Sequence, residues 1–172
     1  MMLVIRTAIV AATMMAAIAA PDAYAAEIVR QTYQNGGSAC TGALPTYEGA
    51  LRKRPRAIVN EGTAVAFITC STNTEEISAS KPTIAFMRLF NSGSGTVTVN
   101  CTFVNGADWE GGANEVRSVT LGSGSFAIAS WGDPADDAPQ FTYRTVNFSC
   151  ALPPGVGVSY VGRRYRQEVG TL

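Results

Sequence analysis

The chain has 172 residues, a length typical of one globular domain. It carries 13 basic and 13 acidic residues, and this neutral balance argues against general binding to nucleic acids or membrane surfaces, which select a basic excess. Because the sequence contains no histidine, it also excludes a Ser-His-Asp triad and a Cys-His pair.

The first 25 residues are organised like a signal peptide. A short basic region precedes an apolar stretch of 14 residues at positions 7–20, which is shorter than the roughly 17 to 25 residues that span a bilayer. In Ala23-Tyr24-Ala25, the two alanines then provide the small residues at positions −3 and −1 of a cleavage site. We expect cleavage after Ala25, or alternatively after Ala26. Residues 26–172 would be exported as one domain, without a membrane span, to the periplasm or the medium.

The mature region shows recurring β-type segments separated by clusters of Gly, Asn, Asp and Pro. Residues 27–41 are expected to form an irregular lead-in, and no 12-residue segment has helical periodicity. The predicted strands are residues 51–60, 63–70, 83–90, 95–104, 116–121, 125–131, 141–152 and 156–165. Apolar and polar side chains alternate most clearly in 95–104 and 141–152, as half-buried strands require.

About eight short strands predict an all-β fold, an antiparallel β-sandwich of Ig-like or jelly-roll type whose strand order stays open. Its four cysteines are Cys40, Cys70, Cys101 and Cys150. An even number in an exported chain favours two disulfides, and zinc is disfavoured because no C-x-x-C pair or histidine is present. Cys101 and Cys150 each lie in mid-strand on an apolar face, so we favour Cys101–Cys150 in the core and therefore Cys40–Cys70.

Two arginine clusters make the charge distribution uneven. The first contains Arg52, Arg54 and Arg56, and the second contains Arg163, Arg164 and Arg166. If the first and last strands are neighbours, the clusters would form a patch suited to phosphate, sulfate or carboxylate groups, such as those of an acidic surface glycan. The alternative is that the first cluster, together with Pro55, protects an edge strand from unwanted pairing.

Two tryptophans are candidates for stacking on a sugar. Trp109 and Trp131 each precede a glycine near the expected end of a strand, and packing against the edge of the core is the alternative role. The acidic loop at residues 133–137 lacks the spacing of a calcium-binding loop. We therefore expect no metal and no cofactor.

Four segments, residues 40–55, 60–62, 111–115 and 150–155, resemble a group of small exported proteins of Gram-negative bacteria. The resemblance covers most of the mature chain and implies export and the cysteine framework, but no particular activity. From the sequence we expect a non-enzymatic exported β-sandwich that binds an anionic glycan or a protein partner at the cell envelope. The alternatives are a structural subunit of a surface appendage or filament, and a glycan-cleaving enzyme that uses two carboxylates.

Overall fold

The structure is a computed structural model and describes residues 27–72, 82–106, 113–132, 141 and 145–168. The expected signal peptide, Trp109 and the acidic loop at 133–137 lie outside these residues. None of the helices in the described residues is long and apolar enough to cross a membrane.

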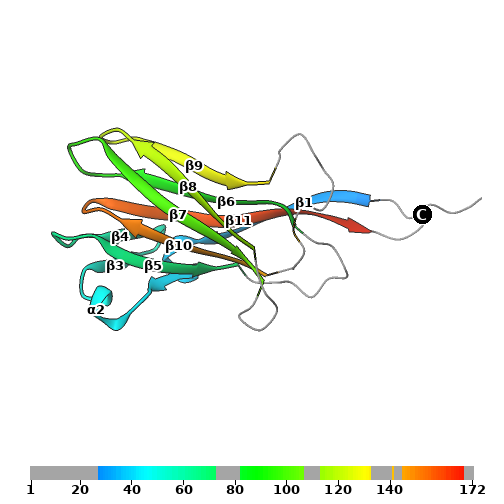
Figure 1. The fold of residues 1–172 in the computed structure, drawn as a ribbon, viewed down its shortest axis with the longest axis horizontal. Helices are drawn as coiled ribbons and strands as arrows, with labels where there is room; N and C mark the ends of the chain where they lie inside the picture. Colours follow the sequence, from blue (N-terminus) through cyan, green and yellow to red (C-terminus); the bar gives the residue numbers. More distant parts are fainter. Residues whose placement is uncertain (1–26, 73–81, 107–112, 133–140, 142–144, 169–172) are drawn as a thin grey trace, which may run out of the picture.

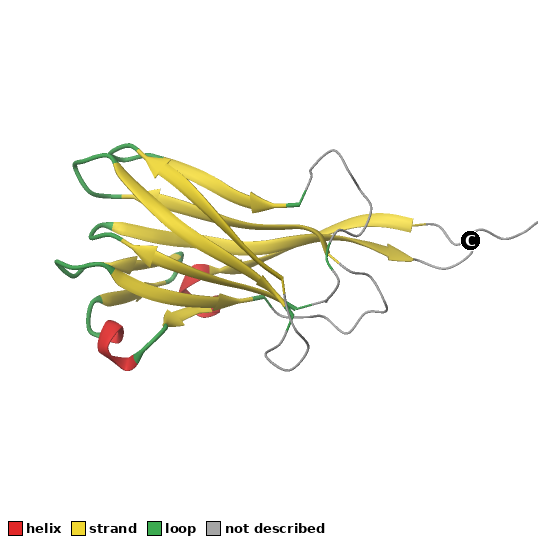
Figure 2. Cartoon of the chain, viewed as in Figure 1, coloured by secondary structure: helices red, strands yellow, loops and turns green. Residues whose placement is uncertain are grey.

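Two antiparallel sheets account for nearly all of the secondary structure (Figures 1 and 2). The strands are β1 (Glu27–Asn35), β2 (Cys40–Gly42), β3 (Leu51–Arg54), β4 (Ala57–Asn60), β5 (Ala66–Ser71), β6 (Pro82–Asn91), β7 (Val97–Asn105), β8 (Ala113–Leu121), β9 (Phe126–Trp131), β10 (Val146–Leu152) and β11 (Val156–Glu168). The helices are α1 (Gly36–Ala39) and α2 (Pro45–Glu48). Sheet A has the order β3-β4-β11-β6-β9, with β1 also paired to β11, and sheet B has the order β2-β5-β10-β7-β8. The predicted β-sandwich is confirmed.

The core lies between the two sheets because each sheet turns its apolar positions inward. In β10, Val146, Phe148, Cys150 and Leu152 are buried while the residues between them are partly exposed. Met87 and Trp131 of sheet A join Phe148 in the same core cluster. The alternation of apolar and polar residues predicted for this segment is therefore confirmed from Val146, where the strand begins, to Leu152.

Both disulfides join neighbouring strands of sheet B. Cys40 in β2 is bonded to Cys70 in β5, and Cys101 in β7 is bonded to Cys150 in β10, so the predicted pairing is confirmed. The partners of each bond face each other directly in the strand register, with Cα atoms 4.0 Å and 4.1 Å apart.

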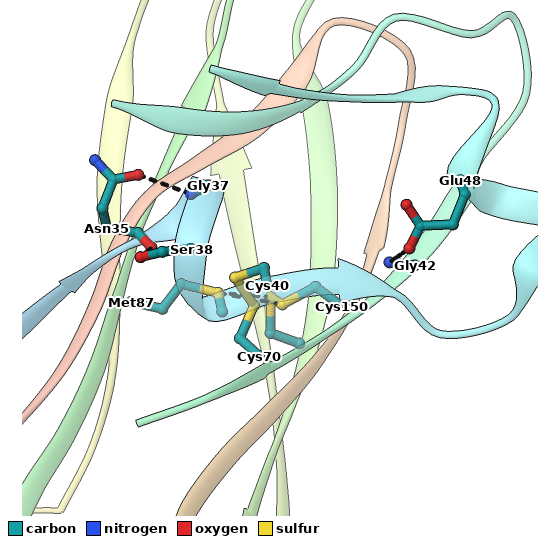
Figure 3. The surroundings of a disulfide bond; sticks show 10 residues. Asn35, Gly37, Ser38, Cys40, Gly42, Glu48, Cys70, Met87 and Cys150 are labelled. Carbon is teal, nitrogen blue, oxygen red and sulfur yellow. Dashed lines mark hydrogen bonds between the residues drawn. A yellow bond between two sulfur atoms is a disulfide. The ribbon is translucent and has the colours of Figure 1, made fainter. Parts of the chain in front are cut away.

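The Met87 sulfur, which comes from sheet A, lies 3.2 Å from the Cys150 sulfur and 3.7 Å from the Cys101 sulfur (Figure 3). A disulfide carries no hydrogen, so this is a packing contact between polarisable sulfur atoms. The Cys101–Cys150 bond therefore contributes to the contact between the sheets as well as to the pairing of β7 with β10.

The structure differs from the predicted lead-in. Residues expected to be irregular form β1, which pairs with β11 from Glu27↔Glu168 to Asn35↔Tyr160. The Asn35 side chain then caps α1 by accepting a hydrogen bond from the Gly37 backbone N–H at 2.8 Å (Figure 3). The polar sequence of β1 hid this strand, because pairing at a sheet edge depends on backbone hydrogen bonds and requires little apolar side-chain surface.

Residues 51–60, predicted as one strand, form a hairpin of β3 and β4 with Pro55 and Arg56 in the turn. Proline ends β3 because it lacks a backbone donor and fixes its own backbone angle. β1, β2 and the second arm of this hairpin account for the difference between the eleven strands of the described residues and the smaller number predicted.

Candidate ligand-binding face

The outer face of sheet A, which is turned away from sheet B, carries an unusual set of side chains. In β6, Ala85, Met87 and Leu89 belong to the core, so Phe86, Arg88 and Phe90 point outward by the two-residue period of a strand. Cross-strand neighbours share a face. Residues of the neighbouring strands that pair in register with these outward positions, directly or through β11, therefore point outward as well. They are Tyr33 in β1, Phe126 and Ile128 in β9, and Tyr160 in β11.

Three aromatic rings from three strands form a cluster on this face. The centroid of the Tyr33 ring lies 5.4 Å from that of Phe86 and 5.3 Å from that of Tyr160, and the Phe86 and Tyr160 centroids are 6.2 Å apart. All three contacts are edge-to-face, the arrangement that aromatic rings favour. Phe86 is covered by its neighbours, whereas the Tyr33 side chain is 57% exposed. The cluster thus presents a fixed aromatic surface to the solvent.

Arg88 lies between two rings of the same face. Its guanidinium carbon is 3.9 Å from the centroid of the Phe126 ring and 5.9 Å from that of Tyr160. A guanidinium over a ring face is attracted by the negative face of the ring, which restricts the side chain without neutralising its charge. Phe126 is itself 61% exposed.

Two glycines in β11 make room for the rings of β6. A Cβ atom at Gly162 would lie 2.5 Å from the Phe86 ring, and one at Gly157 would lie 2.5 Å from the Phe90 ring. The two phenylalanine rings therefore lie across bare backbone instead of standing upright between side chains. Any larger residue at either position would displace the ring and disturb the aromatic surface.

A β-bulge in β11 brings a polar residue to the same surface. The register between β11 and β6 shifts between Val158 and Tyr160, so Ser159 is the extra residue, and bulges often re-aim side chains near functional sites. Ser159 lines an open depression of about 310 Å³. The other residues that line the depression are Arg88, Phe90, Asn91, Ser92, Gly124, Ser125 and Phe126.

The described side chains at the outward strand positions of this face carry charge of one sign. Among the outward strand positions of sheet A whose side chains the structure describes, five are arginines and none is an acid. The five are Arg52, Arg54, Arg88, Arg164 and Arg166. Glu61 follows β4 and pairs with Arg52 at 3.6 Å and also with Arg54. The described part of this face is therefore basic, and Glu61 compensates its charge only at the β3 edge.

The predicted single arginine patch is not formed. The patch required the strand predicted at residues 51–60 to lie beside the last strand. Only β4 does so, through Gly157 and Val158 of β11, and it separates β11 from β3, which carries Arg52 and Arg54. Arg164 is six residues further along β11 than Val158, about 20 Å at the rise of a strand. The two clusters thus occupy distant parts of the sheet, and the aromatic surface lies between them.

The individual arginines also differ from the prediction. Arg163 points inward and is only 3% exposed, with its guanidinium 5.1 Å from the Tyr165 ring, so it cannot belong to a surface patch. Arg56 lies in the β3–β4 turn and not on a strand. Because β3 is an edge strand of sheet A, the position of Arg52, Arg54 and Pro55 fits the alternative interpretation, protection of that edge.

The prediction that Trp131 stacks on a sugar is corrected by its burial. Trp131 is 0% exposed, packs against Phe103 and Phe148, and donates a hydrogen bond from its indole nitrogen to the Glu115 carbonyl oxygen at 3.0 Å. Its neighbour two residues upstream, Ala129, belongs to the same inward set. In the part of the chain that the structure describes, the exposed rings are those of phenylalanine and tyrosine, which a prediction based on tryptophan at strand ends could not identify.

No group of three or more metal-binding side chains occurs among the described residues.

No protein-family model and no curated protein matches the chain. A solved structure described as "CBM4 structure and function" is similar over 78% of this chain and 81% of that chain, at 13% sequence identity and with a TM-score of 0.28. The protein is a disulfide-bonded antiparallel β-sandwich.

Proposed function

We propose that this protein is a non-catalytic binding module that holds a glycan chain across the outer face of sheet A. One observation carries the proposal: exposed aromatic rings and an arginine fixed between two of them gather on one sheet face, beside an open depression. The C–H groups of a sugar ring pack well on an aromatic face, and a tyrosine can also hydrogen-bond to a hydroxyl group at its other end.

Several features support a ligand that lies along the sheet. The aromatic cluster of Tyr33, Phe86 and Tyr160 spans three adjacent strands, and the depression around Ser159 continues the same face toward the strand ends. A surface of this shape offers contacts to several successive sugars without enclosing any of them. Catalysis of bond cleavage would need two carboxylates at a cleft, and the described strand positions on this face carry none.

The same proposal places the protein outside the cytoplasm. Two disulfides are stable in oxidising compartments and rare elsewhere, and both bonds lie buried in sheet B. Together with the expected signal peptide, these bonds support a role in the periplasm or at the cell surface, where glycans are abundant partners.

Replacing Tyr33 or Phe126 by alanine is expected to weaken glycan binding about tenfold, because each change removes one exposed ring and its stacking energy. Binding would be measured by titration calorimetry against uronate oligosaccharides and their neutral, carboxyl-reduced counterparts. Phe67→Ala is the matched control, since Phe67 is an exposed ring, 44% accessible, in β5 of the opposite sheet. If Tyr33→Ala and Phe126→Ala bind as tightly as the parent, or if Phe67→Ala loses as much, the outer face of sheet A is not the glycan site.

A further inference from the structure

We propose that the glycan is acidic and that Arg88 is the residue that binds its carboxylate. This inference rests on the proposed function and specifies its ligand. Arg88 lies in the middle of the face: its cross-strand partners are Tyr160 on one side and Ile128 on the other. A ligand laid over the aromatic cluster and the depression would therefore pass directly over this guanidinium.

Arg88 forms no ion pair with an acidic side chain among the described residues, in contrast to Arg52 and Arg54 of the same face. Both Arg52 and Arg54 pair with Glu61. The buried Nε atom of Arg88 has no hydrogen-bond partner among the described residues. Its contacts are ring faces, which hold the cation but leave its charge uncompensated. A charge held in this way is complementary to an anionic ligand.

The surroundings of Arg88 strengthen its attraction for an anion. Apolar rings exclude water from one side of the guanidinium, and a charge interaction becomes stronger where less water screens it. Stacking on Phe126 also fixes the plane of the group, so that less conformational freedom is lost when a ligand binds. By contrast, the side chains of Arg52 and Arg54 are 70% and 62% exposed and share Glu61. Screening by water and pairing with Glu61 therefore weaken the attraction of Arg52 and Arg54 for an anionic ligand.

The depression beside Arg88 has the size and polarity for one sugar ring. Its volume of about 310 Å³ is at the lower end of small-molecule sites. Its lining combines the Phe90 and Phe126 rings with the hydroxyl-bearing residues Ser92, Ser125 and Ser159. An apolar wall with a few polar groups and one cation at its border is the composition that suits a sugar with a single acidic substituent.

The planar guanidinium points to a carboxylate in particular. Arginine binds planar carboxylates in a two-pronged geometry that lysine cannot reproduce. A sulfate ester shares the negative charge but not the planar shape, and the experiment therefore includes a sulfated polymer. The inferred ligand class is a polysaccharide that contains uronic acids.

The test compares pairs of ligands that differ only in charge. Oligomers of galacturonate, glucuronate and mannuronate are each titrated against the neutral oligomer made by reducing the carboxylates, at physiological salt. The parent protein is expected to bind at least one acidic oligomer about tenfold more tightly than its reduced form. Arg88→Gln is expected to abolish this preference, so that the affinities for the acidic and the reduced oligomer differ by less than about twofold. Arg88→Lys should retain only part of the preference, because lysine keeps the positive charge but lacks the planar guanidinium that binds a carboxylate through two hydrogen bonds.

Arg52→Gln is the matched control and should change the preference by less than about twofold, because the exposed Arg52 is paired with Glu61. Thermal unfolding of each variant checks that the fold is intact. If the parent binds acidic and neutral oligomers equally, or if Arg88→Gln keeps the preference, the acidic ligand is refuted while glycan binding stands. If dextran sulfate binds as tightly as the uronates and Arg52→Gln weakens it as much as Arg88→Gln, the face is a general polyanion surface and the inference also fails. Failure to bind any oligomer would refute the proposed function itself.

Discussion

Replacing Cys101 and Cys150 together by alanine is expected to lower the free energy of unfolding by about 4 kcal/mol, the entropy that a cross-link of this span removes from the unfolded chain. The two residues are 49 apart in sequence. The change also deletes two buried sulfur atoms beside Met87, and the resulting cavity adds to the loss. Urea unfolding of the mature domain, followed by circular dichroism, measures the effect.

The second disulfide provides an internal comparison. Cys40 and Cys70 are 30 residues apart, and because loop entropy grows only slowly with length, their removal should cost nearly as much in the unfolded chain. The Cys40–Cys70 bond, however, attaches the three-residue edge strand β2, so its loss leaves the centre of the core packed. We therefore expect the Cys101/Cys150 variant to be the less stable of the two. An unchanged urea midpoint in that variant would contradict the assigned role of the bond.

Gly162→Ala is expected to destabilise the domain by about 3 kcal/mol, at the upper end of the cost of overpacking. The new Cβ atom would lie 2.5 Å from the Phe86 ring and even closer to the Thr32 backbone oxygen. The ring could turn aside, but the Thr32 oxygen belongs to β1, which is paired with β11, and it moves only if the strands separate. The same change should weaken glycan binding, because a displaced Phe86 ring disturbs Tyr33 and Tyr160.

Gly95→Ala is the matched control, because a Cβ atom there meets no other atom within 4 Å. It should change stability by less than about 1 kcal/mol. Thermal or urea unfolding measures both variants. Equal stability of Gly162→Ala and Gly95→Ala would show that the close packing of Phe86 on the β11 backbone does not exist in solution.

The sequence predicted those parts of the fold in which side-chain alternation is clear. In β7 and β10, polar residues separate the apolar ones, so the inward face and the position of Cys101 and Cys150 could be read directly. β6 contains no such signal, because apolar residues occupy both of its faces from Ile84 to Phe90, with Arg88 as the one exception. The outward aromatic set was therefore hidden within an apparently buried strand.

Three features of the candidate face depend on contacts between distant segments. The bulge at Ser159 arises from the register between β11 and β6, and no local sequence motif predicts it. The pairing of β1 with β11 brings Tyr33 beside Tyr160, which is more than a hundred residues away. The prediction that Trp131 stacks on a sugar was wrong because it relied on the residue type alone. The two-residue period of the strand places Trp131 with Ala129 on the inward side of β9.

A residue-resolved titration tests most directly whether the outer face of sheet A is the ligand face. Uronate oligosaccharide would be added to the isotope-labelled mature domain, and the backbone amide signals would be followed by nuclear magnetic resonance. We predict that the largest shifts fall on Tyr33, Ser159, Tyr160 and Gly162, with a smaller set in β9. Shifts concentrated on the outer residues of sheet B, such as Phe67 and Val116, would contradict the account.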